Sequence, residues 1–314
     1  MPATGAHATT KVLIDADPGT DDALALMMAF NSPSLVVQGI TTVGGNATLA
    51  HTTRNALRLV EYLGFSDDQS SGVPVAKGAA RPLQGSFHYG YYFHGPAGLG
   101  LRLPAPRTRP HSAPADRFIV DMVSASPGEL TVVALGPLTN IAGALALEPK
   151  VAGWIREIVV MGGAAEVPGN VTPHAEFNIY NDPEAAAIVL SSGAPVTMVG
   201  LDVCNQTVVA RDDLPWVPGT SNTAEFANTI LGNWFRRQVD RDAYNLCDPL
   251  ALVAALDPGL LTYWFAHVSV ELEDIDHRGK TTPRYGAGPV RVAVGVDVAA
   301  SRSLMVGLLQ SDRC

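Results

Sequence analysis

Short β-type runs alternate with helical patterns from the N-terminal end as far as Val199, and this alternation constrains the fold more than any other feature. The runs are rich in Val, Ile and Leu, and turns of Gly, Pro, Asn or Asp separate them from the helical segments. Strands are predicted at residues 12–14, 35–41, 73–76, 130–135, 157–161 and 195–199, with helices at 21–31, 115–125 and 138–147, after Asn46 and from Asp182. Such alternation is typical of a parallel sheet with helices on both faces. We therefore predict an α/β fold with a doubly wound, mostly parallel central sheet flanked by helices.

The pattern changes after Leu201. Further elements are predicted as helices at 223–240, 249–256 and 303–309, a hairpin of 267–273 with 281–284, and a strand at 291–297. Residues 77–114 are rich in Gly, Pro and aromatics without periodicity, which is typical of a functional loop, and the aromatics argue against disorder. We find no repeat and no clear linker. The prediction is one domain over residues 11–314, preceded by a disordered tail at 1–10.

Composition narrows the class of protein. The 314 residues are 47% hydrophobic and carry a net charge of −9, which argues against a nucleic-acid or anionic-membrane partner. The N-terminus lacks a basic segment followed by an apolar one, and no apolar run is long enough to span a membrane. Three widely spaced cysteines fit a reduced protein without a disulfide framework. These features predict a cytoplasmic protein.

An Asp-rich turn stands between the first predicted strand and helix. Asp15, Asp17, Asp21 and Asp22 fall within eight residues, around Pro18-Gly19. Carboxylates this close resist joint ionisation unless a cation shares them, and an all-oxygen set favours calcium or magnesium over zinc. Alternatively, Thr20 caps the helix and its dipole favours Asp21 and Asp22. Capping leaves Asp15 and Asp17 unexplained.

A second polar stretch lies at residues 169–178. It is dense in hydrogen-bonding side chains, and Phe177 stands between Glu176 and Asn178. Amide and carboxylate groups beside an aromatic ring suit a polyhydroxylated ligand such as a sugar. The same stretch is equally consistent with a polar surface loop that buries one Phe. Ligands of doubly wound sheets bind beyond the carboxyl ends of the strands, where this stretch and the Asp-rich turn would meet.

Several motifs occur in a characteristic order. They are Asp15-Ala16-Asp17-Pro18-Gly19-Thr20-Asp21-Asp22, Gly45-Asn46, Gly136-Pro137-Leu138-Thr139-Asn140, Met161-Gly162-Gly163, Ala175-Glu176-Phe177-Asn178, Asp182-Pro183-Glu184-Ala185-Ala186 and Asp248-Pro249. In these motifs the chain resembles the inosine–uridine-preferring nucleoside hydrolases over about residues 11–310. The resemblance implies their fold, hydrolysis of the N-glycosidic bond of ribonucleosides to ribose and free base, and a homo-oligomer (dimer or tetramer).

The resemblance also implies a bound calcium ion. By position, its ligands would be the side chains of Asp17, Asp22 and Asp248 and the backbone carbonyl of Leu135. Asp17 would also be the general base for the attacking water. Asp15 would orient the loop from behind.

The sugar contacts follow from the same resemblance. Asp21 and Asn46 would hold the 2′-hydroxyl side of the ribose, and Asn178 the 3′-hydroxyl. Asn170 and Glu176 would take the 5′-hydroxyl, while Met161 and Phe177 would pack on the sugar.

The leaving base needs a proton or another way to carry negative charge. Many family members have His directly before the last metal-binding Asp, but this chain has Cys247, as does a subgroup of the family. Cys247 is therefore either a proton donor or a packing residue. His94 matches an active-site His of the family near the base. Arg237, Gln238 and Tyr244 are candidate base contacts.

Other functions compete with this interpretation. Hydrolysis of another N-ribosyl compound needs the same residues. The pair Asp15-x-Asp17 is similar to haloacid dehalogenase-type phosphatases, but Gly19 replaces the Thr or Val expected there, and Lys is scarce after Lys150. A non-enzymatic sugar-binding protein is the third alternative.

Overall fold

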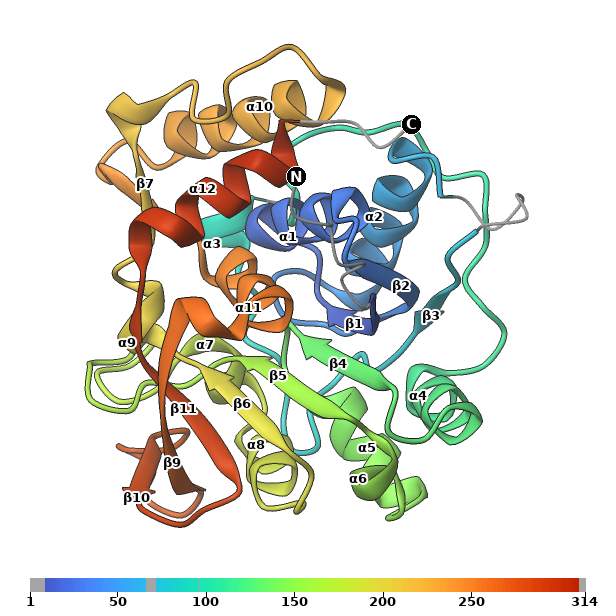
Figure 1. The fold of residues 1–314 in the computed structure, drawn as a ribbon, viewed down its shortest axis with the longest axis vertical. Coiled ribbons are helices and arrows are strands. Elements are labelled where there is room, and N and C mark those ends of the chain that lie inside the picture. The colour runs from blue at the N-terminus through green and yellow to red at the C-terminus, as the bar shows by residue number, and fades with distance from the viewer. Residues whose placement is uncertain (1–8, 66–71, 96, 311–314) are drawn as a thin grey trace, which may run out of the picture.

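A nine-stranded sheet runs through the middle of the molecule (Figure 1). The computed structural model describes residues 9–65, 72–95 and 97–310. The strands of this sheet are β1 (Thr10–Ala16), β2 (Leu35–Thr42), β3 (Val75–Lys77), β4 (Leu130–Ala134), β5 (Glu157–Met161), β6 (Val196–Val199), β9 (Leu261–Val270), β10 (Thr281–Tyr285) and β11 (Val290–Val296). Their order is β10-β9-β11-β6-β5-β4-β1-β2-β3. Neighbours from β11 to β3 are parallel, whereas β9 is antiparallel to both β11 and β10.

The order of the parallel strands locates a ligand site. From β1 the chain moves outward to β2 and β3, then returns to the other side of β1 with β4, β5 and β6. The direction of winding therefore reverses between β1 and β4. In open α/β sheets, ligands bind beyond the carboxyl ends of the strands at such a switch point.

Helices cover both faces of the sheet (Figure 1). The longer ones are α1 (Thr20–Asn31), α2 (Leu49–Tyr62), α4 (Ala115–Ala125), α5 (Thr139–Leu147), α8 (Pro183–Leu190), α10 (Asn222–Arg237), α11 (Cys247–Leu256) and α12 (Val298–Leu309). Short helices are α3 (Tyr91–His94), α6 (Val151–Trp154), α7 (Phe177–Asn181) and α9 (Leu201–Cys204). Helices α1, α2, α10, α11 and α12 contribute to one core, and α4, α5 and α8 to the other.

The central strands are buried on both faces. Along β4, Val132 belongs to the core of α4, α5 and α8, and the next residue, Val133, to the opposite core. Side chains alternate between faces along a strand, so a strand covered on both sides must be apolar throughout. The predicted α/β class, with a doubly wound and mostly parallel sheet, is confirmed.

Some predicted elements differ from the structure. The hairpin is present, but its first strand begins at Leu261 and ends at Val270, because β9 also pairs with β11. The loop over 77–114 contains the short helix α3. A small antiparallel pair, β7 (Val208–Ala210) and β8 (Ala243–Asn245), was not predicted, since strands of three residues leave no periodic pattern.

The predicted tail at residues 1–10 falls largely outside the described residues. Thr10 itself begins β1, where it lies opposite Leu35 of β2. Among the helices that the structure describes, none has the length and apolar character needed to cross a membrane.

Candidate active site

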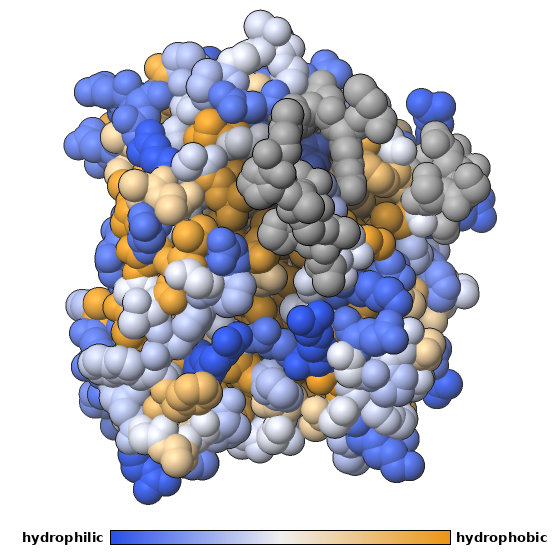
Figure 2. Space-filling view, in the orientation of Figure 1, coloured by the Kyte–Doolittle hydropathy of each residue, from blue (hydrophilic) through white to orange (hydrophobic). Residues whose placement is uncertain are grey.

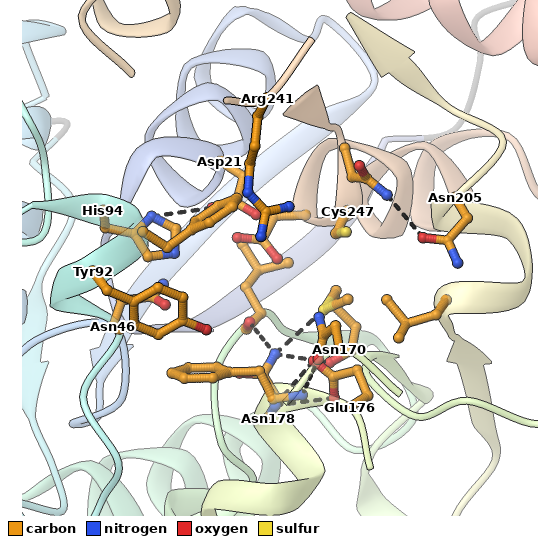
Figure 3. Close-up of a pocket in the computed structure, with 18 residues that line it drawn as sticks. Asp21, Asn46, Tyr92, His94, Asn170, Glu176, Asn178, Asn205, Arg241 and Cys247 are labelled. Carbon is orange, nitrogen blue, oxygen red and sulfur yellow. Dashed lines mark hydrogen bonds and ion pairs between the residues drawn. The ribbon is translucent and has the colours of Figure 1, made fainter. Parts of the chain in front are cut away.

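A cavity of about 280 Å³ is lined by Asp21 from the turn after β1 and by Leu135 from the end of β4, the two strands at the switch point. Figure 3 shows the side chains that line it. This volume is near the lower end for small-molecule sites. The sequence-predicted residues that line it are Asp21, Asn46, His94, Leu135, Met161, Asn170, Glu176, Phe177, Asn178, Cys247 and Asp248. Asp17 and Asp22 are fully buried beside it. Tertiary structure thus brings together segments that are far apart in the sequence.

The Asp-rich turn is held by its own carboxylates. Asp22 accepts hydrogen bonds from the backbone N–H of Gly19 at 2.9 Å and of Asp17 at 3.2 Å, so it caps α1. Gly19, not Thr20, occupies the N-cap position. Asp15 lies before the turn, in β1, and accepts hydrogen bonds from Thr41 Oγ1 at 2.5 Å and from Asn140 Nδ2 at 2.7 Å. Capping is therefore one role of Asp22 and explains none of the other three carboxylates.

Asp17 fits a space that only glycine neighbours leave open. Its Oδ2 accepts from the Asn46 backbone N–H at 2.6 Å, and its Oδ1 has no hydrogen-bond partner among the described residues. A Cβ at Gly45 would lie 2.1 Å from Oδ2, and a Cβ at Gly136 would lie 2.8 Å from Oδ1. These close approaches explain the glycines of two of the sequence motifs.

Four acidic side chains crowd the floor of the cavity. Carboxylate oxygens of Asp21, Asp22 and Asp248 lie within 4.8 Å of one another. Burial, then the charge of Asp22, raises the pKa of Asp21 to about 7. Burial, then neighbouring charge, also raises the pKa values of Asp17 and Asp248 well above their usual range. The carboxylates of this cluster therefore resist being ionised at the same time.

The donor set fits a hard cation. All its groups are oxygens, and a buried one, Asp17 Oδ1, has no hydrogen-bond partner in the described chain. A divalent cation would remove the mutual repulsion and satisfy this atom. The cluster contains Asp22 and Asp248, two of the predicted ligands, with Asp21 as the third member. Asp17 lies beside it, held by Asn46.

The opposite wall of the cavity is built on α7 (Figure 3). Glu176 is the N-cap of this helix and accepts from the backbone N–H groups of Asn178, Ile179 and Gly163. Asn178 Nδ2 donates to the carbonyl of Leu135 at 2.8 Å and to that of Met161 at 3.1 Å. Asn170 Oδ1 accepts from the Phe177 backbone N–H at 2.9 Å. This wall is therefore a rigid polar surface that joins α7 to the ends of β4 and β5.

Replacing Glu176 should reveal its buried charge. Burial raises the pKa of Glu176 from 4.5 to about 7. Because the folded protein binds this proton more tightly than the unfolded chain, Glu176 adds to the free energy of unfolding at low pH. This contribution is complete below pH 4.5 and is lost as the pH rises to about 7. The Gln side chain cannot ionise. Without bound cation, we therefore expect the free energy of unfolding of Glu176→Gln to exceed that of the wild type by up to about 3 kcal/mol at pH 8 and to equal it at pH 4. Urea unfolding at both pH values measures the difference, and a difference independent of pH would contradict the prediction.

His94 is a neutral imidazole in this arrangement. Its Nδ1 accepts from the Thr20 backbone N–H at 3.1 Å, which places the ring proton on Nε2. Burial, then the charge of Arg237, lowers the pKa of His94 to about 3. The ring therefore offers a hydrogen bond from Nε2 rather than a mobile proton. Its predicted catalytic role stays a prediction.

Cys247 lines the cavity and lies next to a second thiol. Interaction with Cys204, then burial, raises the pKa of the Cys247 thiol well above its usual range. The thiol is therefore protonated at neutral pH and reluctant to release its proton.

The comparison with known proteins identifies the family. The family model described as "Inosine-uridine preferring nucleoside hydrolase" matches residues 12–303. The chain belongs to this family.

Individual nucleoside hydrolases resemble the chain along most of its length. "Probable uridine nucleosidase 2" of Oryza sativa subsp. japonica is 41% identical over 307 residues, which cover 92% of this chain and 89% of that protein. "Uridine nucleosidase 1" of Arabidopsis thaliana is 39% identical over 305 residues, with coverage of 92% and 89%. Among solved structures, the plant nucleoside hydrolase PpNRh1 has a TM-score of 0.89 at 36% identity, covering 96% of this chain and 99% of that one.

A bacterial structure is similar as well. The purine-preferring ribonucleoside hydrolase from Gardnerella vaginalis has a TM-score of 0.87 at 33% identity, with coverage of 96% and 99%. The predicted family, fold and enzyme class, an N-glycosyl hydrolase acting on ribonucleosides, are thus confirmed.

The nucleoside hydrolase cavity also contains residues that the sequence did not reveal. They are Gly90, Tyr92, Phe93, Leu201, Asn205, Arg241 and Asn245. The only available signal was the aromatic cluster of the loop over 77–114, because the others are single residues outside any motif.

The predicted base contacts need correction. Arg237 donates to the His94 carbonyl at 3.3 Å, and Gln238 to the Tyr92 carbonyl at 2.5 Å. Tyr244 is fully buried and stacks on Phe93, with 5.7 Å between ring centroids. These three residues do not line the cavity but fix α3 at its edge.

Proposed function

We propose that this nucleoside hydrolase depends on calcium and cleaves ribonucleosides such as uridine to ribose and free base. One observation carries the proposal: a buried acidic cluster and a rigid wall of Asn and Glu side chains face each other across one nucleoside-sized cavity. The names of the plant and bacterial relatives, uridine nucleosidases and ribonucleoside hydrolases, support it. We further propose that the enzyme is cytoplasmic and homo-oligomeric, as its composition and family suggest.

Calcium would be held by Asp17, Asp22, Asp248 and the Leu135 carbonyl. Bound there, it would make a nearby water more acidic and attract the ribose hydroxyl oxygens. The all-oxygen donor set and the closeness of the Asp22 and Asp248 carboxylates support this assignment.

The residues around the cavity have distinct tasks in this mechanism. Asp17 takes a proton from the attacking water at Oδ1, because Oδ2 is occupied by Asn46. Asp21 and Asn46 hold the 2′ side of the ribose, and Asn178 the 3′-hydroxyl. Asn170 and Glu176 bind the 5′-hydroxyl, while Met161 and Phe177 pack on the ring.

Breaking the C1′–N bond builds positive charge on the ribose. The carboxylates of the floor stabilise that charge at the place where it develops, and preorganised stabilisation of this kind is usually the largest catalytic effect. Water then attacks C1′, and the bond electrons leave with the base.

A reducing-sugar assay tests the proposed function. The wild-type enzyme should release ribose from a panel of purine and pyrimidine nucleosides, and a calcium chelator should stop the release. Phosphate release from nucleotides without ribose release would indicate a phosphatase instead. Binding of ribose without turnover of any nucleoside would indicate a sugar-binding protein.

Removing the Cys247 thiol should have a small effect. We expect Cys247→Ala to lower kcat on every cleaved nucleoside less than about tenfold, because the thiol holds its proton too tightly to donate it. Loss of a true general acid typically lowers kcat about 10²–10⁴-fold. Cys247→Ser controls for volume, since it keeps a hydroxyl of similar size. Steady-state kinetics on uridine and inosine give the comparison. A hundredfold fall in both variants would show that the thiol donates the proton, because a serine hydroxyl is too weak an acid to replace it.

A further inference from the structure

One wall of the cavity carries polar groups that the mechanism above does not use. Arg241 and Asn205 line it on the side of Cys247, away from the wall built on α7 (Figure 3). Asn245, which also lines the cavity, is hydrogen-bonded to Asn205. The following inference rests on the proposed function, because it assigns the part of the nucleoside that this wall receives.

The backbone at Arg241 is fixed by another arginine. Arg211 donates from Nη2 to the carbonyl of Arg241 at 2.6 Å and to that of Gln238 at 3.0 Å, and from Nη1 to that of Phe235 at 3.1 Å. These bonds hold the turn that follows α10. The Arg241 side chain starts from a defined position at the rim of the cavity.

The guanidinium of Arg241 is directed into the cavity (Figure 3). Its Cζ lies 5.7 Å from the centre of the Phe93 ring, a cation–π distance. Within the described chain, no carboxylate lies at ion-pair distance from it. Because a guanidinium stays charged at all relevant pH values, a permanent cation faces the space between His94 and Cys247 without a protein counter-ion.

The two asparagines next to it are hydrogen-bonded to each other. Asn245 Nδ2 donates to Asn205 Oδ1 at 2.8 Å, which orients both amides. This bond leaves the Nδ2 donor of Asn205 and the Oδ1 acceptor of Asn245 available. The free donor can bind a carbonyl and the free acceptor an N–H, and uracil and hypoxanthine carry both groups.

The chemistry of bond cleavage gives the cation a task. The electron pair of the C1′–N bond passes to the base nitrogen, and an oxo-base spreads that negative charge onto its carbonyl oxygens. A guanidinium beside those oxygens stabilises the departing anion more than the neutral bound base, so it lowers the barrier. The water proton goes to Asp17, the water oxygen bonds to C1′, and the base anion takes a proton after it departs.

We propose that Arg241, Asn205 and Asn245 form a base subsite that binds the carbonyl-bearing edge of oxo-bases, with Arg241 stabilising the negative charge on the leaving base. The ribose lies deeper, over the acidic cluster. The subsite therefore selects nucleosides by the hydrogen-bonding edge of the base and by the charge that the base carries away.

A comparison of leaving groups tests the role of Arg241. Arg241→Gln should lower kcat on uridine about 10²-fold or more, as removal of one charge-stabilising donor does. It should change kcat on p-nitrophenyl β-D-ribofuranoside less than about threefold, because nitrophenolate leaves readily as an anion without such help. Arg236→Gln is the matched control, since Arg236 is an exposed arginine in the last turn of α10, five residues before Arg241, and does not line the cavity.

Each outcome decides the proposal. An equal fall on both substrates would show a structural role, and no fall on uridine would show that Arg241 does not touch the reaction; either overturns the proposal. If the wild type cleaves no nucleoside at all, the proposed function itself fails, before any variant is compared.

The amide pair has a separate test. Cytosine carries an amino group where uracil has a carbonyl, so its edge has donor and acceptor reversed. Asn205→Ala should reduce the preference for uridine over cytidine, measured as the ratio of kcat/KM values, about tenfold, because the variant loses the donor that binds the uracil carbonyl. An unchanged ratio would overturn the assignment of the pair to the base.

Discussion

Asp17→Asn should lower kcat on uridine about 10³-fold or more while the protein stays folded. The substituted amide keeps an oxygen that can accept from the Asn46 N–H but removes the basic oxygen that has no hydrogen-bond partner in the described residues. Loss of a general base alone typically costs 10²–10⁴-fold, and loss of charge near the ribose adds to it. Steady-state kinetics, with circular dichroism to check the fold, measure the effect.

Asp15→Asn is the matched control for this change. Asp15 is equally buried, stands two residues earlier in β1 and does not line the cavity. Its Oδ1 accepts from Thr41 and Asn140, and an amide oxygen can do the same. We expect Asp15→Asn to lower kcat less than about tenfold. Near-wild-type turnover by Asp17→Asn, or an equal loss in both variants, would refute the assignment of Asp17 as the base.

Removing calcium should abolish turnover and lower the melting temperature by about 5–10 °C. The acidic cluster is buried, and its carboxylates raise one another's pKa values, so the cation-free fold contains uncompensated repulsion. A ligand at about a thousand times its dissociation constant stabilises the folded state by about 4 kcal/mol, which gives a shift of this size. Differential scanning fluorimetry with chelator, then with added Ca²⁺ or Mg²⁺, measures the shift.

The pH and one variant sharpen that experiment. Because the ligands must be deprotonated, the calcium-induced shift should be larger at pH 8 than at pH 5. Asp22→Asn removes a member of the cluster and should reduce the shift to less than about 2 °C at the same calcium concentration. A chelated enzyme that keeps both its melting temperature and its turnover would show that these carboxylates need no cation.

The predicted fold followed from local patterns. Short β-branched runs alternate with helical segments, and whether a segment forms a strand or a helix depends largely on residues close to it in the sequence. The strands of the parallel sheet and most longer helices were therefore predicted within a few residues. The antiparallel pair β7–β8 escaped because three-residue strands owe their existence to the partner strand. The same reason explains β9, whose true start is set by its pairing with β11.

The site residues, like the helices and strands, could be predicted only where they belong to a local sequence pattern. Motif residues such as Asp22, Asn46 and Asn178 could be predicted because each is embedded in a recognisable local sequence, and the structure places all three in or beside the cavity. Arg237 and Gln238 were misassigned as base contacts because spacing along α10 cannot show which side chains face the cavity and which hold α3. Arg241 does line the cavity, but the sequence around it does not distinguish it from Arg237.

The sequence by itself determined the Asp-rich turn, the alternation that makes the sheet, and the family. These depend on contiguous residues: Pro18 and Gly19 make the turn, and Asp22 caps the helix that follows. Only the tertiary structure decided what stands opposite the acidic cluster. The base subsite joins Asn205 to Asn245 through the pairing of β7 with β8, and Arg241 reaches the cavity because Arg211 fixes the turn after α10. Such contacts between distant segments arise from burial and long-range hydrogen bonding, which leave no mark on any single stretch of sequence.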